Sequence, residues 1–595
     1  MKTTKNIARL AVTAGLTAAL SFGGVMAPVT MAFAAEGGST VTFNDPDYAA
    51  STTYKGIQIF KANVATTNGT TTASNISWAD TAVETAVIAA IQEKEPAYTS
   101  RNAQDAADWL NEHNKDADRT DSATRVNSGH VLSAIASKLE NTGTWTKASA
   151  GSSSLTGLDA GYWLFLTDST TKSSDKSTDS FTSPVYAVID GTNNTVKITP
   201  KKSVPTVEKK ILDDKKVKDN ITTVPAGDWG DVADSQIGQE INYKLTGTIA
   251  DNYATYDSYA YKFTDVLSNG LDYVDDSVEV YTLNDNTYTK IDASKYTVDW
   301  ASNKLTVEFK VGEGKKGLKD VDGVDDNTKI VVFYKAKLNG SAVIGNATDG
   351  NKGGNPNTVT LTYSNNPYVE GTGTTIADTV ADFAFKLNLN KVDQGTEKGL
   401  SGAVFTIQSA DENTKDQYIA SNAGTVEGEN VVAGQLVTVS SGTDLPDCVK
   451  FTSDKDGKIA VSGLDAGSYK VTEVEAPGDE YAKASPFTFT ITPTYDPATM
   501  KVTNLTAAVS ETGRTDIAVG ELDNSAGDNK LTGTQNGIDG ATGLVTITVG
   551  NTKKINLPLT GLNGVTFTWI AGGAVLCIGV AHLIRSRKRD EGSEE

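Results

Sequence analysis

The chain contains very little cysteine and histidine. Its 595 residues include two cysteines, Cys448 and Cys577, and three histidines. Two cysteines cannot build a disulfide framework, and neither lies in a recognisable catalytic sequence. The histidines, at positions 113, 130 and 582, are too far apart to indicate a zinc site. We therefore expect no metal and no cofactor, and stability must have another source.

Positive charge is also scarce. The chain has 53 lysines and arginines against 74 aspartates and glutamates, a net charge of −21 at pH 7. Such an acidic balance argues against nucleic acid as a partner, because phosphate binding needs clustered positive charge. The length is sufficient for three or four domains.

The N-terminus has the pattern of a secretory signal peptide. Lys2, Lys5 and Arg9 precede an apolar stretch over residues 10–29, and Ala32-Phe33-Ala34, with a small residue on each side, supplies a cleavage site. We therefore assign residues 1–35 to the signal and expect the rest of the chain to be exported.

A second apolar stretch lies near the C-terminus. Residues 565–584 are apolar or small with few exceptions, and twenty residues are about what a helix needs to cross a bilayer. Basic residues at 585–589 follow at once, which places this end in the cytoplasm. The sequence predicts a transmembrane helix with a short basic tail.

The pentapeptide Leu557-Pro558-Leu559-Thr560-Gly561 stands directly before that helix. Pentapeptide, apolar helix and basic tail in this order resemble the LPxTG sorting signal of Gram-positive surface proteins. The resemblance implies that a sortase cleaves between Thr560 and Gly561 and transfers the Thr560 carbonyl to an amine. A plain C-terminal membrane anchor is the alternative.

The residues between these ends are mostly typical of β-strands. Short runs rich in Val, Ile, Thr and Tyr, such as 53–60 and 162–166, alternate with Gly, Asn, Asp and Ser. Three segments, 80–93, 102–113 and 126–139, instead carry apolar residues at helical spacing. The sequence predicts a mainly β protein of tandem immunoglobulin-like β-sandwiches, the first with a helical insertion. The expected domains are 36–200, 201–370 and 371–556, followed by a sorting segment over 557–595.

Three motifs characterise the last of these domains. They are "FKLNLNKVDQGTEKGLSGAVFTI" (385–407), "TSDKDGKIAVSGLDAGSYKVTEVEAPGDEY" (452–481) and "GLVTITVGNTKK" (543–554). Together they resemble the B-type repeat domain of collagen adhesins, a sandwich also found in pilins. In that family a first-strand lysine forms an amide with a last-strand asparagine, assisted by a buried acid. The resemblance assigns these roles to Lys391, Asn551 and Glu473.

The chemistry explains why the three residue types are needed. An amine attacks only when it is neutral, and burial lowers the pKa of a lysine. A carboxylic acid buried in the same core stays protonated and can polarise the carboxamide. Ammonia leaves and an isopeptide bond remains, closing a loop that contributes about 5 kcal/mol on the loop-entropy formula for disulfides. Such a bond would account for the missing cysteines.

The middle domain has a related pattern, in "PTVEKKI", "YKFTDVLSNGLDY" and "GNPNTVTLTYSNNP". It resembles the isopeptide-forming middle domain of fimbrial backbone proteins, in which an aspartate takes the place of the acid. The resemblance points to Asp265 and Asn357, with Lys209 or Lys210 as the amine. We choose Lys209 because it shares a strand face with the apolar residues at 207 and 211. Three further asparagines, Asn355, Asn365 and Asn366, compete for the amide role.

The first domain resembles the N-terminal domain of major pilins, through "TYKGIQIFKANV" (53–64) and "GLDAGYWLFLTD" (157–168). We find no complete set of lysine, acid and asparagine there and assume that it has no cross-link. At its end, "NTVKITPKK" partly matches the pilin motif WxxxVxVYPK, in which the lysine accepts the threonine of another subunit. The tryptophan is missing and Thr199 replaces the tyrosine, but Lys201 has the position of the acceptor.

The sequence as a whole resembles Gram-positive major pilins. The expected function is a backbone subunit of a covalent surface pilus that supports adhesion, with Thr560 of one subunit joined to Lys201 of the next. The expected partners are a pilus-specific class C sortase, a housekeeping sortase, other copies of the chain, ancillary pilins, peptidoglycan and a host surface ligand. A monomeric wall-anchored adhesin or ancillary pilin is the first alternative, and a surface enzyme built on β-sandwiches is the second. As a pilus backbone subunit, the chain is expected to turn over no substrate.

Overall fold

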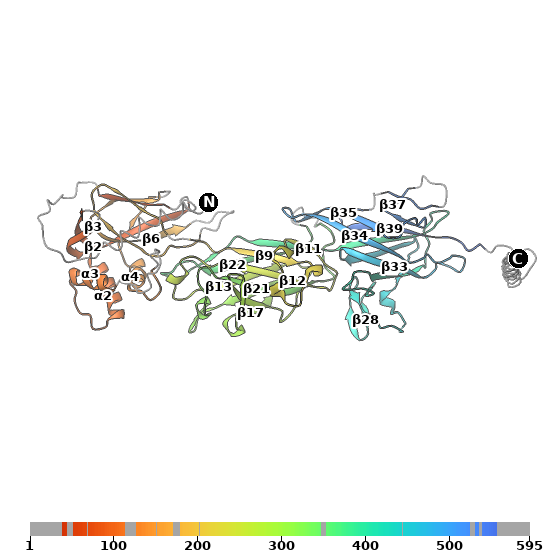
Figure 1. The fold of residues 1–595 in the computed structure, drawn as a ribbon, viewed down its shortest axis with the longest axis horizontal. Coiled ribbons are helices and arrows are strands. Elements are labelled where there is room, and N and C mark those ends of the chain that lie inside the picture. The colour runs from red at the N-terminus through yellow and green to blue at the C-terminus, as the bar shows by residue number, and fades with distance from the viewer. Residues whose placement is uncertain are drawn as a thin grey trace, which may run out of the picture.

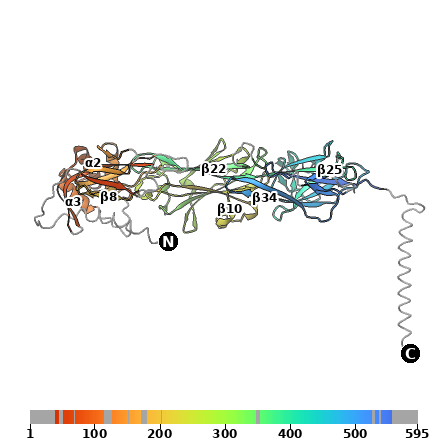
Figure 2. The same ribbon diagram turned by 90° about the horizontal axis from the view of Figure 1, so that it is seen from above.

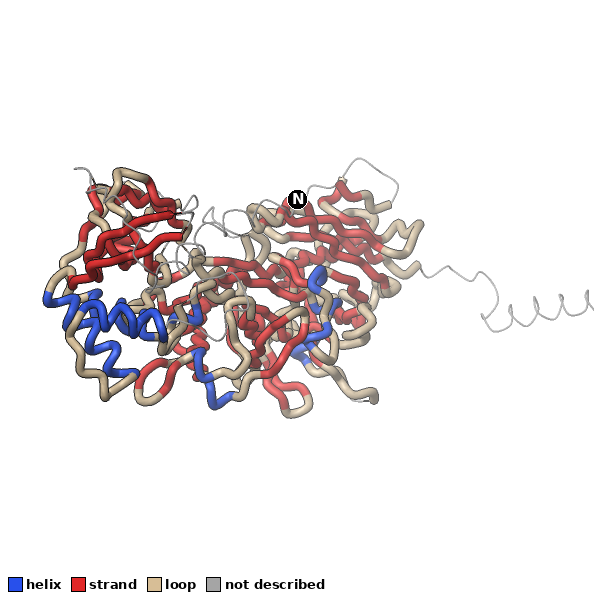
Figure 3. Tube along the Cα trace, turned by 60° about the vertical axis from the view of Figure 1, so that its left-hand side comes forward, coloured by secondary structure: helices blue, strands red, loops and turns tan. Residues whose placement is uncertain are grey.

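The computed structural model describes residues 38–44, 51–67, 70–113, 126–149, 152–170, 179–200, 203–346, 353–442, 444–523, 530–534 and 538–555. They form three regions in a row along an elongated molecule (Figure 1). These are an N-terminal region (38–200), a middle region (203–384) and a C-terminal region (385–555). The fold is mainly β, and helices longer than one turn lie in the N-terminal region, at one end of the row (Figure 3).

The N-terminal region packs two sheets and three helices. One sheet has the order β3-β2-β6-β7 with β4 on β2, and the other has the order β5-β1-β8. The strands are β1 (Ser39–Phe43), β2 (Thr52–Thr67), β3 (Thr70–Trp78), β4 (Thr146–Lys147), β5 (Ser154–Leu158), β6 (Gly161–Thr170), β7 (Val185–Ile189) and β8 (Thr195–Ile198), and the helices are α2 (Thr81–Lys94), α3 (Ala103–His113) and α4 (Val131–Glu140). The predicted helical insertion is confirmed.

The helix starts follow from local side chains. Asp80 caps α2, because its carboxylate accepts a hydrogen bond from the Val83 amide at 2.9 Å. The third helix begins later than the predicted residue 126. His130 is its N-cap, with Nδ1 accepting from the Leu132 amide at 3.2 Å. Val126 is buried but precedes this cap, so apolar spacing alone placed the start too early.

The middle region is a sandwich of two seven-stranded sheets. Their orders are β10-β9-β12-β21-β15-β16, with β14 on β21, and β11-β24-β22-β13-β18-β17, with β23 on β22. The elements are β9 (Val207–Leu212), β10 (Trp229–Gly230), β11 (Val232–Asp234), β12 (Glu240–Gly247), β13 (Tyr261–Leu267), β14 (Leu271–Tyr273), β15 (Glu279–Asn284), β16 (Thr287–Lys290), β17 (Thr297–Ala301), β18 (Lys304–Phe309), β19 (Val311–Gly312), β20 (Lys315–Lys316), β21 (Lys329–Leu338), β22 (Asn355–Ser364), β23 (Thr372–Thr374) and β24 (Asp378–Phe383). Strands such as β12 and β22 alternate buried and half-buried residues, as a sandwich requires.

The C-terminal region is a second sandwich. A four-stranded sheet, β32-β25-β39-β36, faces a sheet of order β30-β27-β26-β33-β34-β35 with β31 on β26. The strands are β25 (Phe385–Asp393), β26 (Val404–Ser409), β27 (Tyr418–Ile419), β28 (Gly424–Val426), β29 (Glu429–Val431), β30 (Leu436–Val437), β31 (Phe451–Thr452), β32 (Lys458–Leu464), β33 (Gly467–Glu475), β34 (Phe487–Asp496), β35 (Lys501–Val509), β36 (Ile517–Val519), β37 (Glu521–Leu522), β38 (Gly533–Thr534) and β39 (Leu544–Asn551). The first strand, β25, pairs in parallel with the last, β39.

The sheet of the middle region extends past residue 370, where we predicted its end. Strand β24 pairs with both β22 and β11, so it belongs to the middle sandwich. The Gly- and Thr-rich segment that suggested a spacer contains β23, which also pairs with β22. Only Ala384 separates β24 from β25. The two sandwiches therefore follow each other along the chain with almost no linker, and the top view shows them in a row (Figure 2).

Side chains tie the regions together at both joints. Tyr368, from the middle region, is buried against the N-terminal core and donates to the Thr182 carbonyl. At the other joint, Tyr495 donates to Asp234 at 2.6 Å, and the Gln236 amide donates to the Gly434 carbonyl. The row of regions is thus joined by specific buried contacts.

Candidate functional site

Three strands of the C-terminal region bring the predicted residues Lys391, Glu473 and Asn551 together. Lys391 lies on the first strand, β25, Glu473 on β33 and Asn551 at the end of the last strand, β39. In the β25–β39 pairing Lys391 stands opposite Val549, so its long side chain reaches forward to Asn551. The topology thus places an amine and an amide from the two ends of the region side by side.

The cluster is compact and sealed from solvent. Lys391 is 0% exposed, Asn551 2% and Glu473 5%. The Lys391 amine donates to Oδ1 of Asn551 at 2.5 Å and to the Val549 carbonyl at 3.2 Å. The Asn551 amide nitrogen donates to Oε1 of Glu473 at 2.8 Å. The acid therefore contacts the nitrogen that would leave if the lysine attacked the carboxamide.

Burial changes the acid–base behaviour of this lysine. Loss of hydration lowers the pKa of Lys391 to about 8, although the nearby carboxylate of Glu473 opposes the shift. The amine lies 3.9 Å from Oε1 of Glu473, which is close enough to accept its proton through a small movement. At pH 7 about a tenth of the amine is consequently neutral, which is the form that nucleophilic attack requires.

The middle region also brings its three predicted residues, Lys209, Asp265 and Asn357, together in the core. Lys209 lies on its first strand, β9, Asp265 on β13 and Asn357 on β22. Strands β13 and β22 are paired, with Leu267 opposite Asn357. All three predicted side chains are 0% exposed.

A fourth residue, Tyr334 of β21, completes this middle cluster. Its hydroxyl donates to Oδ2 of Asp265 at 2.5 Å. It accepts from the Lys209 amine at 2.8 Å and from the Asn357 amide nitrogen at 2.6 Å. Lys209 also donates to Oδ2 of Asp265 at 2.5 Å. Tyr334 was not among the predicted residues. A tyrosine in a strand usually indicates ordinary core packing, so no sequence signal distinguished it.

Aromatic rings line the middle cluster. The Lys209 amine lies 5.0 Å from the ring centre of Tyr243 and 5.1 Å from that of Tyr334, and the two rings stack at 5.2 Å. Loss of hydration lowers the pKa of Lys209 to about 8, against the opposing effect of Asp265. Both clusters thus hold a lysine with a lowered pKa beside an acid and an amide.

The alternatives to Lys209 and Asn357 lie elsewhere. Lys210 points away from the core and pairs with Asp231 at 2.6 Å. Asn355 is buried, but its carboxamide binds both backbone groups of Val343. The remaining two asparagines, Asn365 and Asn366, bind Asp179 and the Tyr368 amide respectively. Among the described asparagines, only Asn357 contacts the cluster.

The N-terminal region contains a buried lysine and acid without an amide. The Lys55 amine lies 2.8 Å from Glu140 and 4.7 Å from the ring centre of Trp145. Lys55 is 6% exposed. Within the described part of this region, no side-chain amide lies within hydrogen-bond distance of that amine.

The predicted sorting signal and acceptor lie outside the described residues. This holds for Lys201, for the pentapeptide Leu557, Pro558, Leu559, Thr560 and Gly561, and for the predicted signal peptide and transmembrane segment. Among the helices that are described, none is both long and apolar enough to cross a membrane. These assignments remain predictions.

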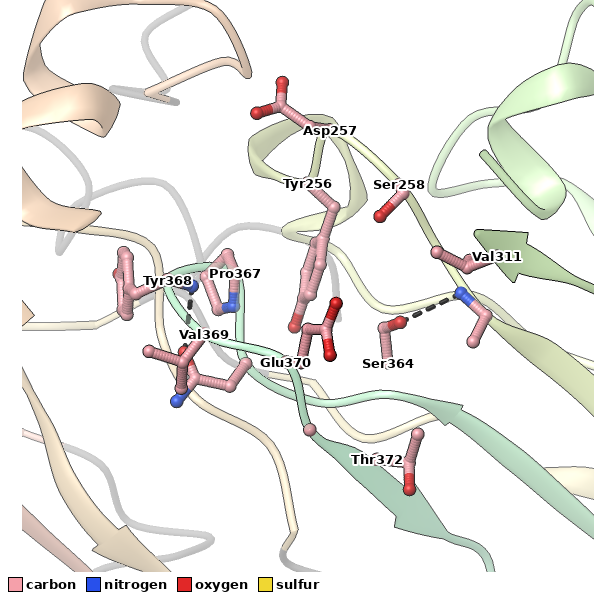
Figure 4. Close-up of a pocket in the computed structure, with 13 residues that line it drawn as sticks. Tyr256, Asp257, Ser258, Val311, Ser364, Pro367, Tyr368, Val369, Glu370 and Thr372 are labelled. Atoms are coloured by element: carbon pink, nitrogen blue, oxygen red, sulfur yellow. Dashed lines mark hydrogen bonds between the residues drawn. The ribbon is translucent and has the colours of Figure 1, made fainter. Parts of the chain in front are cut away.

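Two further features bear on whether the described residues could bind a metal or a ligand. The described residues contain no group of three or more His, Cys, Asp or Glu side chains arranged to hold a metal ion. A cavity of about 370 Å³ lies beside the joint between the N-terminal and middle regions (Figure 4), where Tyr256, Val311, Pro367 and Glu370 line it. None of its lining residues belongs to either lysine cluster.

Known proteins are similar to this chain in part of its sequence and in structure. A family model described as SpaA, prealbumin-like fold domain, matches residues 385–440 and 437–506. No curated protein matches. Similar solved structures include the T6 backbone pilin of Streptococcus pyogenes, at 13% identity and a TM-score of 0.46, with 88% of this chain and 99% of that one covered. Another is the major pilin SpaD of Corynebacterium diphtheriae, at 17% identity and a TM-score of 0.42, with 87% of this chain and 98% of that one covered. A third is the major pilin RrgB of Streptococcus pneumoniae, at 16% identity and a TM-score of 0.37, with 69% of this chain and 87% of that one covered. The C-terminal region is thus similar in sequence to prealbumin-like domains.

Proposed function

We propose that this chain is a structural subunit whose middle and C-terminal regions are each closed by an isopeptide bond. The observation that carries the proposal is the pair of buried clusters, each of which holds a first-strand lysine with a pKa of about 8, an acid and an amide. Lys391 contacts its amide directly, and Lys209 and Asn357 both contact the Tyr334 hydroxyl. In each, the lysine Nζ bonds to the asparagine Cγ, the Cγ–Nδ2 bond breaks, and ammonia leaves. The proposed bonds are Lys209–Asn357, assisted by Asp265, and Lys391–Asn551, assisted by Glu473.

Intact mass tests these bonds. The chain is expected to weigh less than its sequence by two ammonia molecules, counted after any signal removal. Asp265→Ala and Glu473→Ala should each restore one of them, and a digest should yield the corresponding branched peptides. As a control, Asp231→Ala removes a carboxylate that binds the neighbouring Lys210 outside the core, and both ammonia losses should persist. A mass equal to the plain sequence would remove the proposal of internal bonds.

We further propose that the chain is the backbone subunit of a sortase-assembled pilus on the cell wall. The support is the sequence pattern: a sorting pentapeptide at 557–561, an apolar segment behind it, and Lys201 in the position of a pilin-motif acceptor. In the proposed polymer the Thr560 carbonyl of one subunit forms an amide with the Lys201 amine of the next.

Polymer formation tests this second step. Cells that express the chain with a class C sortase should display a ladder of covalent polymers on denaturing gels. Lys201→Ala should abolish the ladder, whereas Lys202→Ala, which removes the adjacent lysine, should leave it intact. A chain that reaches the wall only as a monomer, with both lysines present, would instead favour the wall-anchored adhesin.

A further inference from the structure

The two lysine clusters differ in what lies between the acid and the amide. In the C-terminal region Glu473 contacts the Asn551 nitrogen directly, at 2.8 Å. In the middle region that nitrogen, on Asn357, donates instead to the Tyr334 hydroxyl, and the hydroxyl donates to Asp265. The shorter aspartate thus reaches its amide through a phenol.

We propose that the Tyr334 hydroxyl relays a proton from Asp265 to the leaving nitrogen of Asn357. This role rests on the bond proposed above between Lys209 and Asn357. It makes Tyr334 a catalytic residue of that single-turnover reaction, since its oxygen contacts both reacting nitrogens.

The proton path balances the reaction. Asp265 first takes a proton from the Lys209 ammonium, which frees the amine to attack Cγ of Asn357. Asp265 then donates to the phenolic oxygen while the phenol gives its own proton to Nδ2, and ammonia departs. The attacking nitrogen loses its second surplus proton to Asp265. The acid ends protonated, the phenol is regenerated, and no other reactant is needed.

The surroundings of Tyr334 suit this role. Its side chain is 1% exposed, and its ring is held against Tyr243 with the two planes 12° apart. Burial, followed by the charge of Asp265, raises the pKa of Tyr334 well above its ordinary value, so the phenol keeps its proton until the amide requires it. A phenylalanine would preserve the packing and remove only the hydroxyl.

The test compares two phenylalanine variants of the full-length chain made by cell-free translation. Tyr334→Phe should slow ammonia loss at the middle site by about 100-fold, the contribution typical of a general acid. Tyr261→Phe is the matched control. Tyr261 is also fully buried, lies on the same strand as Asp265, and donates to the Thr248 carbonyl at 2.8 Å, away from the cluster. This variant should form the bond at the wild-type rate.

Time-resolved peptide mapping separates the possible outcomes. Resistance of the middle region to trypsin shows in the same samples that each variant has folded. Equal rates in Tyr334→Phe and the wild type, or equal slowing in both phenylalanine variants, would overturn the relay but leave the bond. Absence of the Lys209–Asn357 peptide from the wild type would overturn the bond and the relay together.

Discussion

The N-terminal and C-terminal regions both bury a lysine beside a carboxylate, yet only one of them adds an amide. In the C-terminal sandwich the last strand, β39, runs parallel to the first and delivers Asn551 to Lys391. In the N-terminal region Lys55 meets Glu140 from the end of α4, and an ion pair completes the site. A buried lysine–acid pair therefore does not by itself indicate a cross-link. In the C-terminal region the additional amide comes from the strand that returns beside the first one.

The largest effect is expected when the C-terminal acid is removed. Without the carboxyl, Glu473→Ala should leave Lys391 and Asn551, which are 160 positions apart, unjoined. Loss of a closed loop of that size costs about 5 kcal/mol, and the melting temperature of the region should fall by roughly 10–20 °C. Calorimetry measures the change. Glu475→Ala, at the exposed end of the same strand, should have almost no effect, and equal losses in both variants would contradict the assignment.

An engineered amide tests whether the acid is needed. Glu140→Gln gives Lys55 a carboxamide partner but removes its carboxylate, so we expect no ammonia loss by intact mass. The same change leaves a buried ammonium without its counter-charge and should destabilise the N-terminal region by about 3 kcal/mol. Glu93→Gln, which breaks a more exposed ion pair with Lys138, should cost less than about 1 kcal/mol. Bond formation at position 140 would show that burial and an amide suffice.

The pH dependence of bond formation should be shared by the two proposed sites. Both lysines have a pKa lowered to about 8, and in the proposed path the neighbouring acid holds the proton that the lysine gives up. This proton stays within the pair below pH 8 and is lost to solvent above it, so the rate of ammonia loss should change little between pH 6 and pH 7 and fall roughly tenfold between pH 9 and pH 10. Peptide mapping over time at each pH measures it. A rate that instead rises tenfold between pH 6 and pH 7 would show that the proton must leave the pair before attack, and would contradict the proposed path.

The smallest effect is expected at the joint between the two sandwiches. Burial, and then the neighbouring Asp234, raises the pKa of Asp465 well above its usual value. The folded chain thus binds a proton that the unfolded chain releases above pH 4 or so, and this contribution to stability is lost as pH rises. Asp465→Asn should reduce the loss of stability with rising pH and raise the melting temperature at pH 8 by roughly 2–4 °C.

An exposed aspartate provides the control for that joint. The side chain of Asp447 is 99% exposed, so Asp447→Asn should leave the pH dependence of melting unchanged. If the melting temperature of Asp465→Asn fell more steeply with rising pH than that of the wild type, the Asp465 carboxyl would be ionised in the folded state. The direction of its pKa shift would then be wrong.

Much of the fold and of both clusters was predictable from the sequence. Alternating apolar residues predicted the mainly β class, and apolar residues at helical spacing predicted the helical insertion. Both patterns arise because burial of one face repeats apolar residues with the period of the strand or the helix. The choice of Lys209 over Lys210 followed from the same alternation. Tyr334 could not be predicted, because its role depends on three contacts from other strands and its own strand reads as ordinary core. The end of the middle sandwich was misplaced because β23 has the composition of a spacer.

The positions of the two lysines also determine how the molecule would carry tension. In the proposed fibre, load enters at Lys201, crosses the Lys209–Asn357 and Lys391–Asn551 bonds, and leaves through Thr560. The segments enclosed by the bonds, 210–356 and 392–550, would then not be extended by the load. Between the two bonds only residues 358–390 could be pulled out, to a length of roughly 110 Å when fully extended. The N-terminal region would lie outside this path, where the ion pair of Lys55 and Glu140 has no pulling force to resist.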